Sequence, residues 1–193
     1  MNIGIFGGSF NPIHIGHALI AGHIIESGVV DRVWLMVSPQ NPLKPQSSLA
    51  NDLHRLRMTE LVSRRLEGVT TSAFEMQLPR PSYTIDTLTA LQEKFPDDNF
   101  HLIIGADNWA LFDQWRESEK ILSRFHVLIY PRLGYDVDIP ATLADRVKLV
   151  DAPIIEISST EIRRRLAVKQ SITFHVPEAV EEYIHANNLY RDL

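Results

Sequence analysis

Residues 2–17 read Asn-Ile-Gly-Ile-Phe-Gly-Gly-Ser-Phe-Asn-Pro-Ile-His-Ile-Gly-His, and the rest of the chain is organised around them. Its apolar start, Ile3 to Phe6, predicts a buried strand. Gly7-Gly8-Ser9 and then Asn11-Pro12 predict a loop that bends tightly, and a helix is expected from about Ile15 to Glu26. Glycines let backbone N–H groups face an anion, and the positive end of the helix adds to that field. The loop is therefore either a phosphate site or a tight turn.

His14 and His17 lie three positions apart at the start of this helix, so their side chains share a face and can reach the same phosphate. Gly16 between them leaves room for a nucleotide. Alternatively, one histidine caps the helix and the other packs. The Gly-Gly-Ser-Phe run that ends at Phe10 favours the phosphate site, although it is neither a Walker loop nor Gly-x-Gly-x-x-Gly.

Composition narrows the protein class. A chain of 193 residues with 45% hydrophobic and 22% charged residues predicts one globular domain over 1–193. The formal charge of −5 argues against a nucleic-acid partner, so small anionic substrates are expected. The lack of cysteine excludes disulfides, thiolate nucleophiles and cysteine-ligated zinc. Because no signal segment or membrane-length apolar run is recognisable, we expect a cytoplasmic protein without a membrane partner.

Strand-like and amphipathic helix-like segments alternate along the chain, which predicts an α/β protein with a parallel sheet. The expected strands are 32–38, 69–75, 100–105, 125–130, 147–150 and 154–157, and the expected helices are 52–66, 82–95, 108–122 and helices from 159 and 177. Leu53 and Leu61 are apolar positions of the helix 52–66. Its basic residues are expected mostly on the solvated face: Arg55, Arg57, Arg64 and Arg65.

The proline-rich stretch 39–45 predicts a loop at the carboxyl end of a strand, where open α/β sheets bind ligands. Lys44 in this loop is either solvated or in contact with phosphate. Asp107, just after the strand 100–105, can accept hydrogen bonds from ribose or cap the next helix, and the two roles are compatible. Trp109 and Trp115 are either both core residues, or one of them is a platform for a flat ring.

A second polar stretch, Ile157-Ser-Ser-Thr-Glu-Ile-Arg163, is expected at a strand-to-helix junction. Its hydroxyls and free N–H groups can bind phosphate, and Arg163 lies one turn further on the face of Ser159 and Thr160. A capping box explains Ser-Ser-Thr-Glu equally well, and the two roles are compatible.

Both polar stretches resemble known motifs. Gly7-Gly-Ser-Phe-Asn-Pro12 with His14-Ile-Gly-His17 resembles the signature of the nucleotidylyltransferase superfamily, whose members share a Rossmann-like fold with helices on both faces of the sheet. Ile157-Ser-Ser-Thr-Glu-Ile-Arg163 is similar to the motif with which nicotinate- and nicotinamide-nucleotide adenylyltransferases hold ATP phosphates. Further resemblance to these enzymes is carried by Pro81-Ser-Tyr-Thr84, Asp86-Thr-Leu88, Gly105-Ala-Asp107 and Trp115.

The resemblance implies transfer of the AMP moiety of ATP to nicotinate mononucleotide, giving deamido-NAD and pyrophosphate in NAD biosynthesis. The catalytic residues it implies are His14, His17, Lys44 and Arg163. The ATP-binding residues it implies are Gly7, Gly8, Ser9, Phe10, Gly16, Gly105, Asp107, Ser158, Ser159, Thr160 and Arg163. The mononucleotide-binding residues it implies are Thr84, Trp115 and Lys44.

Two departures concern the pyridine pocket. A histidine often found before the loop lysine is Leu43 here, and a frequent tyrosine is replaced around Leu111. The sequence does not decide whether Arg132 contacts a ligand. A homo-oligomer is compatible with the chain.

The implied chemistry needs charge and alignment rather than a base, because the mononucleotide phosphate is already a nucleophile. The motifs hold few carboxylates, so we expect Mg²⁺ to be carried by ATP. Alternatives are a preference for nicotinamide mononucleotide, transfer to phosphopantetheine or a polyol phosphate, or a non-catalytic nucleotide sensor. A redox Rossmann enzyme is disfavoured because the three-glycine fingerprint is missing.

Overall fold

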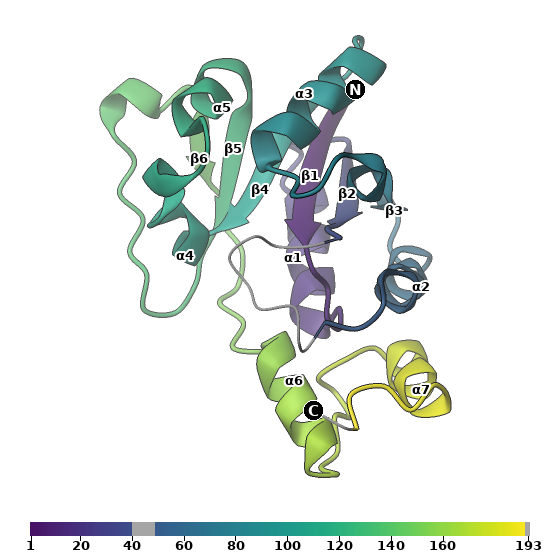
Figure 1. Cartoon of the computed structure of the whole chain (residues 1–193). Coiled ribbons are helices and arrows are strands. Elements are labelled where there is room, and N and C mark those ends of the chain that lie inside the picture. The colour runs from purple at the N-terminus through teal and green to yellow at the C-terminus, as the bar shows by residue number, and fades with distance from the viewer. Residues whose placement is uncertain (40–48, 192–193) are drawn as a thin grey trace.

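The computed structural model describes residues 1–39 and 49–191. Its centre is a six-stranded sheet in the order β3-β2-β1-β4-β5-β6, and every neighbouring pair is parallel (Figure 1). The strands are β1 (Asn2–Gly8), β2 (Arg32–Val37), β3 (Val69–Ser72), β4 (Asn99–Gly105), β5 (His126–Tyr130) and β6 (Val147–Leu149). The strand order reverses between β1 and β4, which is where open α/β sheets bind ligands. The predicted Rossmann-like fold is confirmed.

Helices and short 3₁₀ turns connect the strands. They are α1 (Ile15–Glu26), α2 (Asp52–Ser63), η2 (Phe74–Gln77), α3 (Thr84–Lys94), α4 (Ala106–Trp109), η3 (Phe112–Gln114), α5 (Ser118–Arg124), η4 (Ala141–Leu143), α6 (Ser159–Ala167) and α7 (Glu178–Ala186). The bounds of α1 agree with those predicted. In Figure 1, α6 and α7 lie beyond the carboxyl end of β1.

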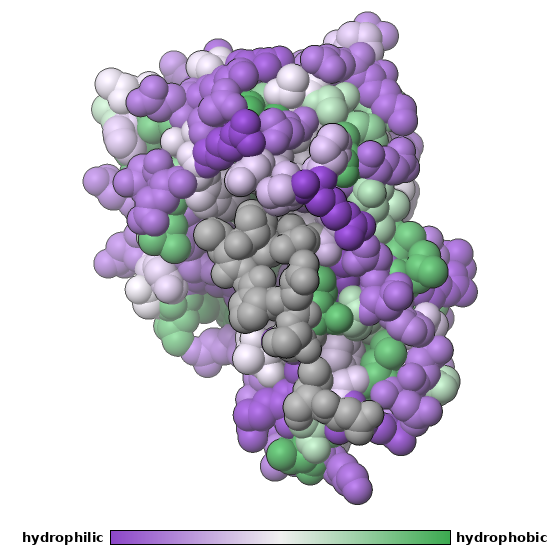
Figure 2. Space-filling model, in the orientation of Figure 1, coloured by the Kyte–Doolittle hydropathy of each residue, from purple (hydrophilic) through white to green (hydrophobic). Residues whose placement is uncertain are grey.

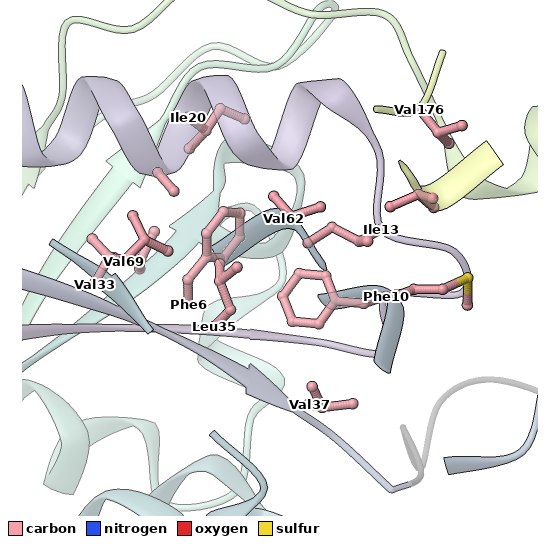
Figure 3. Close-up of a cluster of buried hydrophobic side chains, with 14 of the residues drawn as sticks. Phe6, Phe10, Ile13, Ile20, Val33, Leu35, Val37, Val62, Val69 and Val176 are labelled. Atoms are coloured by element: carbon pink, nitrogen blue, oxygen red, sulfur yellow. The ribbon is translucent and has the colours of Figure 1, made fainter. Parts of the chain in front are cut away.

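Helices cover both faces of the sheet because its central strands are apolar on both sides. On one face, Phe6, Val33 and Leu35 pack with residues of α1 and α2 (Figure 3). On the other face, Ile3 and Ile5 pack with residues of α3 and α5. Neighbouring side chains of β1 thus enter opposite layers, as the alternation of a strand requires.

The predicted helix 108–122 is wrong, because this segment is broken into α4, η3 and α5. Trp115 has an extended backbone, and Glu117 lies in the left-handed region with φ 53°. Neither conformation continues a right-handed helix. The breaks bring both Trp109 and Trp115 against the ring of Phe112, with centroids 5.2 and 5.3 Å away.

Two predicted strands also differ from the structure. The strand 69–75 ends at Ser72, whose hydroxyl accepts a hydrogen bond from the N–H of Phe74 at 3.2 Å and so turns the chain into η2. The run 154–157 is not a strand in the described structure. Ile155 and Ile157 instead pack against the core on the α1 face.

The solvated-face prediction is wrong for Arg55. Its side chain is 0% exposed, whereas Leu53 on the same helix is 73% exposed. The helix therefore turns a guanidinium, rather than this leucine, toward the protein interior.

The outer surface is mainly polar in the view of Figure 2, where hydrophobic residues form small separate groups. Within residues 1–39 and 49–191, no helix combines the length and the apolar character that crossing a membrane requires.

Candidate active site

The loop between β1 and α1 begins at Ser9, two residues later than predicted. Gly7 and Gly8 are the last two residues of β1 and pair with Met36 and Val37 of β2, so they belong to the strand and not to the loop. The left-handed residue in this loop is Phe10, with φ 43°. Gly7 is exposed at the carboxyl edge of the sheet, whereas Phe10 is buried.

Three carbonyl groups of this loop are occupied by donors from distant parts of the chain. Arg55 donates to the Ser9 carbonyl at 2.6 Å. Arg163 donates through Nη1 to the Asn11 carbonyl at 2.8 Å, and Ser159 donates through Oγ to the Pro12 carbonyl at 2.9 Å. Carbonyl oxygens repel phosphate, so turning them toward protein donors makes the loop a better anion site.

The side chain of Asn11 fixes the loop from a further direction. Its Oδ1 accepts hydrogen bonds from the Ala50 backbone at 3.0 Å and from the Tyr190 hydroxyl at 2.9 Å. Tyr190 is buried and lies in the C-terminal segment, so the chain end helps to hold the N-terminal motif. Burial raises the pKa of Tyr190, which keeps its hydroxyl a donor at neutral pH.

The two motif histidines stack on each other. Their ring centroids are 3.6 Å apart and their planes differ by 24°. His17 Nδ1 accepts a hydrogen bond from the His14 backbone N–H at 3.2 Å, so a neutral His17 ring carries its proton on Nε2. Phe6 and Phe10 contact the His17 ring edge-on, at centroid distances of 5.9 and 5.0 Å. The structure thus confirms that both imidazoles share one face at the start of α1.

His14 is uncharged in the free protein at neutral pH. Its side chain is buried, and its Nδ1 has no hydrogen-bond partner within residues 1–39 and 49–191. Burial lowers the pKa of His14 from 6.5 to about 3, with a further contribution from the nearby positive charge of Arg132. A neutral imidazole still donates one N–H, so it can hydrogen-bond an anion without carrying charge.

Gly16 is buried in the first turn of α1, and neighbouring side chains lie close to the place where a Cβ atom would be. A Cβ atom there would lie 3.0 Å from His14 Nδ1 and 3.1 Å from Ile155 Cγ2. The space expected for a nucleotide directly over Gly16 is therefore taken by the His14 ring and Ile155. A larger residue would displace the imidazole.

The hydroxyls at the start of α6 have separate partners. Ser158 is the N-cap and accepts from the Glu161 backbone at 3.2 Å, while Ser159 binds the Pro12 carbonyl. Thr160 accepts from Arg163 Nη2 at 3.4 Å. The Ser158 half of the predicted capping box is confirmed. The Glu161 carboxylate pairs with Arg164 at 2.7 Å.

Asp107 lies where β4 ends, beside β1. Gly105 is the N-cap of α4, so the prediction that Asp107 caps this helix is wrong. A Cβ on Gly105 would come within 2.3 Å of Asp107 Oδ1, so the glycine is needed for the carboxylate to fold back over the strand end. Arg132 Nε lies 3.6 Å from that oxygen, and Arg132 Nη2 donates to the Tyr130 hydroxyl at 3.3 Å.

Thr84 and Trp115 occupy neighbouring elements. Thr84 is the first residue of α3 and is half-buried, as is Trp115 just after η3. Arg116, the residue after Trp115, contacts the residues around Thr84. Its guanidinium lies 4.6 Å from the centre of the Tyr83 ring and 3.8 Å from the Asp86 carboxylate. Lys44 and Leu43 lie outside the described residues.

Sequence reasoning missed Arg55, Asn11 and Tyr190 as parts of the site. Their partners are backbone carbonyls or side chains that are far away along the chain, and no local pattern marks such contacts. For Arg55 the only available signal was its place in an amphipathic helix, and that signal pointed to solvent. No three His, Asp or Glu side chains of the described residues are grouped so that they could hold a metal ion.

A family model described as cytidylyltransferase-like matches residues 5–165. A relative from Bacteroides thetaiotaomicron, whose name is "Probable nicotinate-nucleotide adenylyltransferase", is 47% identical over 184 residues, which cover 95% of this chain and 91% of the relative. The chain belongs to the nicotinate-nucleotide adenylyltransferase family. A Flavobacterium psychrophilum protein with the same family name is 41% identical and is covered over its full length, together with 99% of this chain.

Two solved structures have folds similar to that of this chain. "Plasmodium falciparum nicotinic acid mononucleotide adenylyltransferase complexed with NaAD" superposes with a TM-score of 0.82 and 22% identity, covering 98% of this chain and 97% of that one. A second structure of the same Plasmodium protein, "complexed with APC", gives a TM-score of 0.80 with 22% identity and 98% and 96% coverage. The similarity of fold therefore extends over nearly the whole chain.

Proposed function

We propose that this protein is an adenylyltransferase that joins the AMP moiety of ATP to nicotinate mononucleotide, giving deamido-NAD and pyrophosphate. The observation that carries the proposal is the meeting of the two polar motifs. Ser159 and Arg163 of the second motif donate to the Pro12 and Asn11 carbonyls of the first, next to the stacked histidines.

The reaction is a displacement at the α-phosphate of ATP. An oxygen of the mononucleotide phosphate forms the new bond to the α-phosphorus, the bond from that phosphorus to the oxygen bridging to the β-phosphate breaks, and pyrophosphate leaves with the electron pair. The nucleophile is already ionised at neutral pH, so no general base is required. The protein must align two anions and stabilise the charge that grows on the leaving group.

Arg163 and the two histidines suit that task. Arg163 keeps a planar guanidinium beside the loop, and His17 presents an Nε2–H when its ring is neutral. Neutral His14 adds a hydrogen bond without the cost of a buried charge. We assign the ATP phosphates to these residues and to the N-termini of α1 and α6, which include the backbone of Gly16 and the hydroxyls of Ser158, Ser159 and Thr160.

ATP then lies on the edge formed by exposed Gly7 and half-buried Gly8 and Ser9, with Phe10 beneath it. Gly105 at the end of β4 and Asp107 in α4 face the ribose. The mononucleotide lies on the α3 side, against Thr84 and the face of Trp115. Lys44, which remains a prediction from sequence, is assigned to phosphate.

Mg²⁺ fits this site as a companion of ATP rather than as a resident ion. Asp107 is the one carboxylate among the assigned residues, and it lies 3.6 Å from Arg132, so these residues do not form an oxygen cage. Bound to ATP phosphate oxygens, Mg²⁺ would neutralise charge as pyrophosphate departs. The cytoplasmic location, the absence of a nucleic-acid or membrane partner and the homo-oligomer stay predictions from sequence.

A pyrophosphate-release assay with ATP tests the proposal. Nicotinate mononucleotide, nicotinamide mononucleotide and phosphopantetheine are offered in parallel to the purified protein. We expect pyrophosphate in equal amount to deamido-NAD with nicotinate mononucleotide and much slower release with the other two. Release with phosphopantetheine alone, or with none of the three, would overturn the proposal.

A further inference from the structure

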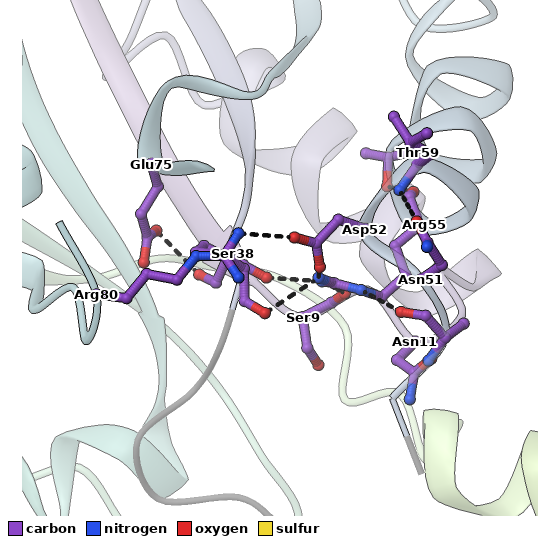
Figure 4. A network of polar contacts seen from close by, with 12 residues as sticks. Ser9, Asn11, Ser38, Asn51, Asp52, Arg55, Thr59, Glu75 and Arg80 are labelled. Carbon is purple, nitrogen blue, oxygen red and sulfur yellow. Dashed lines mark hydrogen bonds and ion pairs between the residues drawn. The ribbon is translucent and has the colours of Figure 1, made fainter. Parts of the chain in front are cut away.

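A chain of hydrogen bonds that are buried or partly buried runs from the loop of the first motif through Arg55 and Ser38 to Glu75 (Figure 4). A further bond continues it from Glu75 to Ser82, just before α3. The chain begins at Arg55, which donates to the carbonyls of Ser9 at 2.6 Å and Ser38 at 2.7 Å. The same guanidinium reaches the carbonyls of Ala50 at 3.0 Å and Pro39 at 3.3 Å. Arg55 therefore fixes the end of β2 relative to the ATP loop.

Glu75 continues the chain from the end of β2. Its buried carboxylate accepts hydrogen bonds from Ser38 Oγ at 2.9 Å and from Ser82 Oγ at 2.7 Å. Burial raises the pKa of Glu75, and the two hydroxyls with the charge of Arg55 act in the opposite direction. A buried carboxylate with two short hydrogen bonds holds its partners in defined positions.

Ser82 lies two residues before Thr84, the first residue of α3. It is 5% exposed, so its hydroxyl faces the interior and not a ligand. A parallel connection runs through Asp52, which accepts hydrogen bonds from both Arg55 and Arg80, the latter at 3.0 Å. The segment 80–84 is thus tied to Arg55 by two routes.

We propose that Glu75 is a positioning residue for the mononucleotide, acting through Ser82 to set the start of α3 relative to the carboxyl end of β2. This inference rests on the proposed function, because it assigns the pyridine ring to Thr84. Glu75 does not touch substrate. Its loss should leave the ATP loop in place, because Arg55 binds the backbone carbonyl of Ser38 and not its hydroxyl.

The test compares Michaelis constants for the two substrates in four variants. Ser82→Ala and Glu75→Ala each break the bridge to α3. Glu75→Gln preserves it, because serine hydroxyls can donate to the amide oxygen and accept from the amide nitrogen. Ser63→Ala is the matched control, since Ser63 also bonds a hydroxyl, that of Thr71, at 2.9 Å but lies outside the chain of contacts.

We expect Ser82→Ala and Glu75→Ala to raise the KM for nicotinate mononucleotide at least about tenfold while the KM for ATP changes less than about twofold. Glu75→Gln should stay within about threefold of wild type for both substrates, as should Ser63→Ala. Calorimetric titration of each protein with nicotinate mononucleotide should show the same order of affinities. Melting temperatures identify any variant that fails to fold. If Glu75→Ala does not fold, the Michaelis constants of Ser82→Ala alone test the inference.

An unchanged KM for the mononucleotide in folded Ser82→Ala would overturn the inference, as would equal rises in both Michaelis constants. Wild type serves to separate the two claims. If it releases no pyrophosphate with nicotinate mononucleotide, the proposed function fails. If wild type is active and the variants show no split between substrates, only the role of Glu75 fails.

Discussion

Arg163 donates from Nη1 to the carbonyl oxygen of Asn11 at 2.8 Å and so joins two residues that are 152 positions apart. The contact lies beyond the carboxyl end of β1, and Ser159 reinforces it through the Pro12 carbonyl. The fold thereby places a guanidinium, two stacked imidazoles and two helix N-termini around one loop. Such a cluster suits a polyanion, because each member supplies a donor or a positive charge.

His17 should stabilise the charge of the departing pyrophosphate. His17→Ala is expected to lower kcat by roughly a hundredfold or more. The variant should still fold, because the core around Phe6 and Phe10 does not depend on the imidazole alone. Steady-state kinetics together with a melting curve provide the check. Near-normal turnover in the folded variant would reject this role.

The burial of His14 leads to a prediction about its titration. Because the pKa of His14 is about 3 in the folded protein against 6.5 as its ordinary value, His14 should remain neutral from pH 8 to pH 5 in an NMR titration. In the urea-unfolded protein the same ring should titrate near pH 6.5. A resonance of folded His14 that titrates above pH 6 would contradict the burial argument.

The lowered pKa of His14 has a consequence for stability. Its neutral form contributes stability that is fully present above pH 6.5 and is lost as the pH falls toward 3, because only the unfolded chain takes up the proton in that window. The free energy of unfolding should drop by up to about 1.4 kcal/mol per pH unit from this residue. Urea unfolding of wild type and His14→Gln at pH 7 and pH 5 measures the difference. Equal pH dependence in both proteins would count against it.

Trp115 should contribute to only one substrate site. Trp115→Ala is expected to raise the KM for the mononucleotide and to leave the KM for ATP nearly unchanged, because the indole would lose its stacking on the pyridine. Trp109→Ala is the matched control, since Trp109 packs on the same Phe112 ring and donates to the Asp138 carbonyl. Parallel changes for both substrates would show that Trp115 is merely structural.

Arg55 should be a major source of stability. Arg55→Met leaves the partly buried carbonyls of Ser9 and Ser38 without their donor, and we expect the free energy of unfolding in urea to fall by about 3 to 5 kcal/mol. Arg57→Met is the control, because Arg57 is 43% exposed and pairs with Glu60 at the surface. Its cost should stay within about 0.5 kcal/mol. Equal losses of unfolding free energy in the two variants would mean that the buried contacts of Arg55 contribute little to stability.

The sequence predicted what depends on local patterns. The bounds of α1 follow from Pro12 and His14 before it and from its apolar residues, and the parallel sheet follows from alternating segments. The helix predicted for residues 108–122 was wrong, although their apolar residues fit a helical period. Glu117 adopts a left-handed conformation there, which a single sequence does not reveal. Arg55 and Glu75 were missed for another reason. Their burial depends on partners that only the folded chain brings near.

We infer that the two motifs hold a single ATP molecule. A crystal structure of the protein with an ATP analogue that cannot be cleaved between its α- and β-phosphates tests this most directly. We predict one triphosphate contacted by His17 from one side and by Arg163 from the other, above the Asn11 and Pro12 carbonyls. A triphosphate bound in another cavity, touching neither side chain, would show that the two motifs do not form one ATP site.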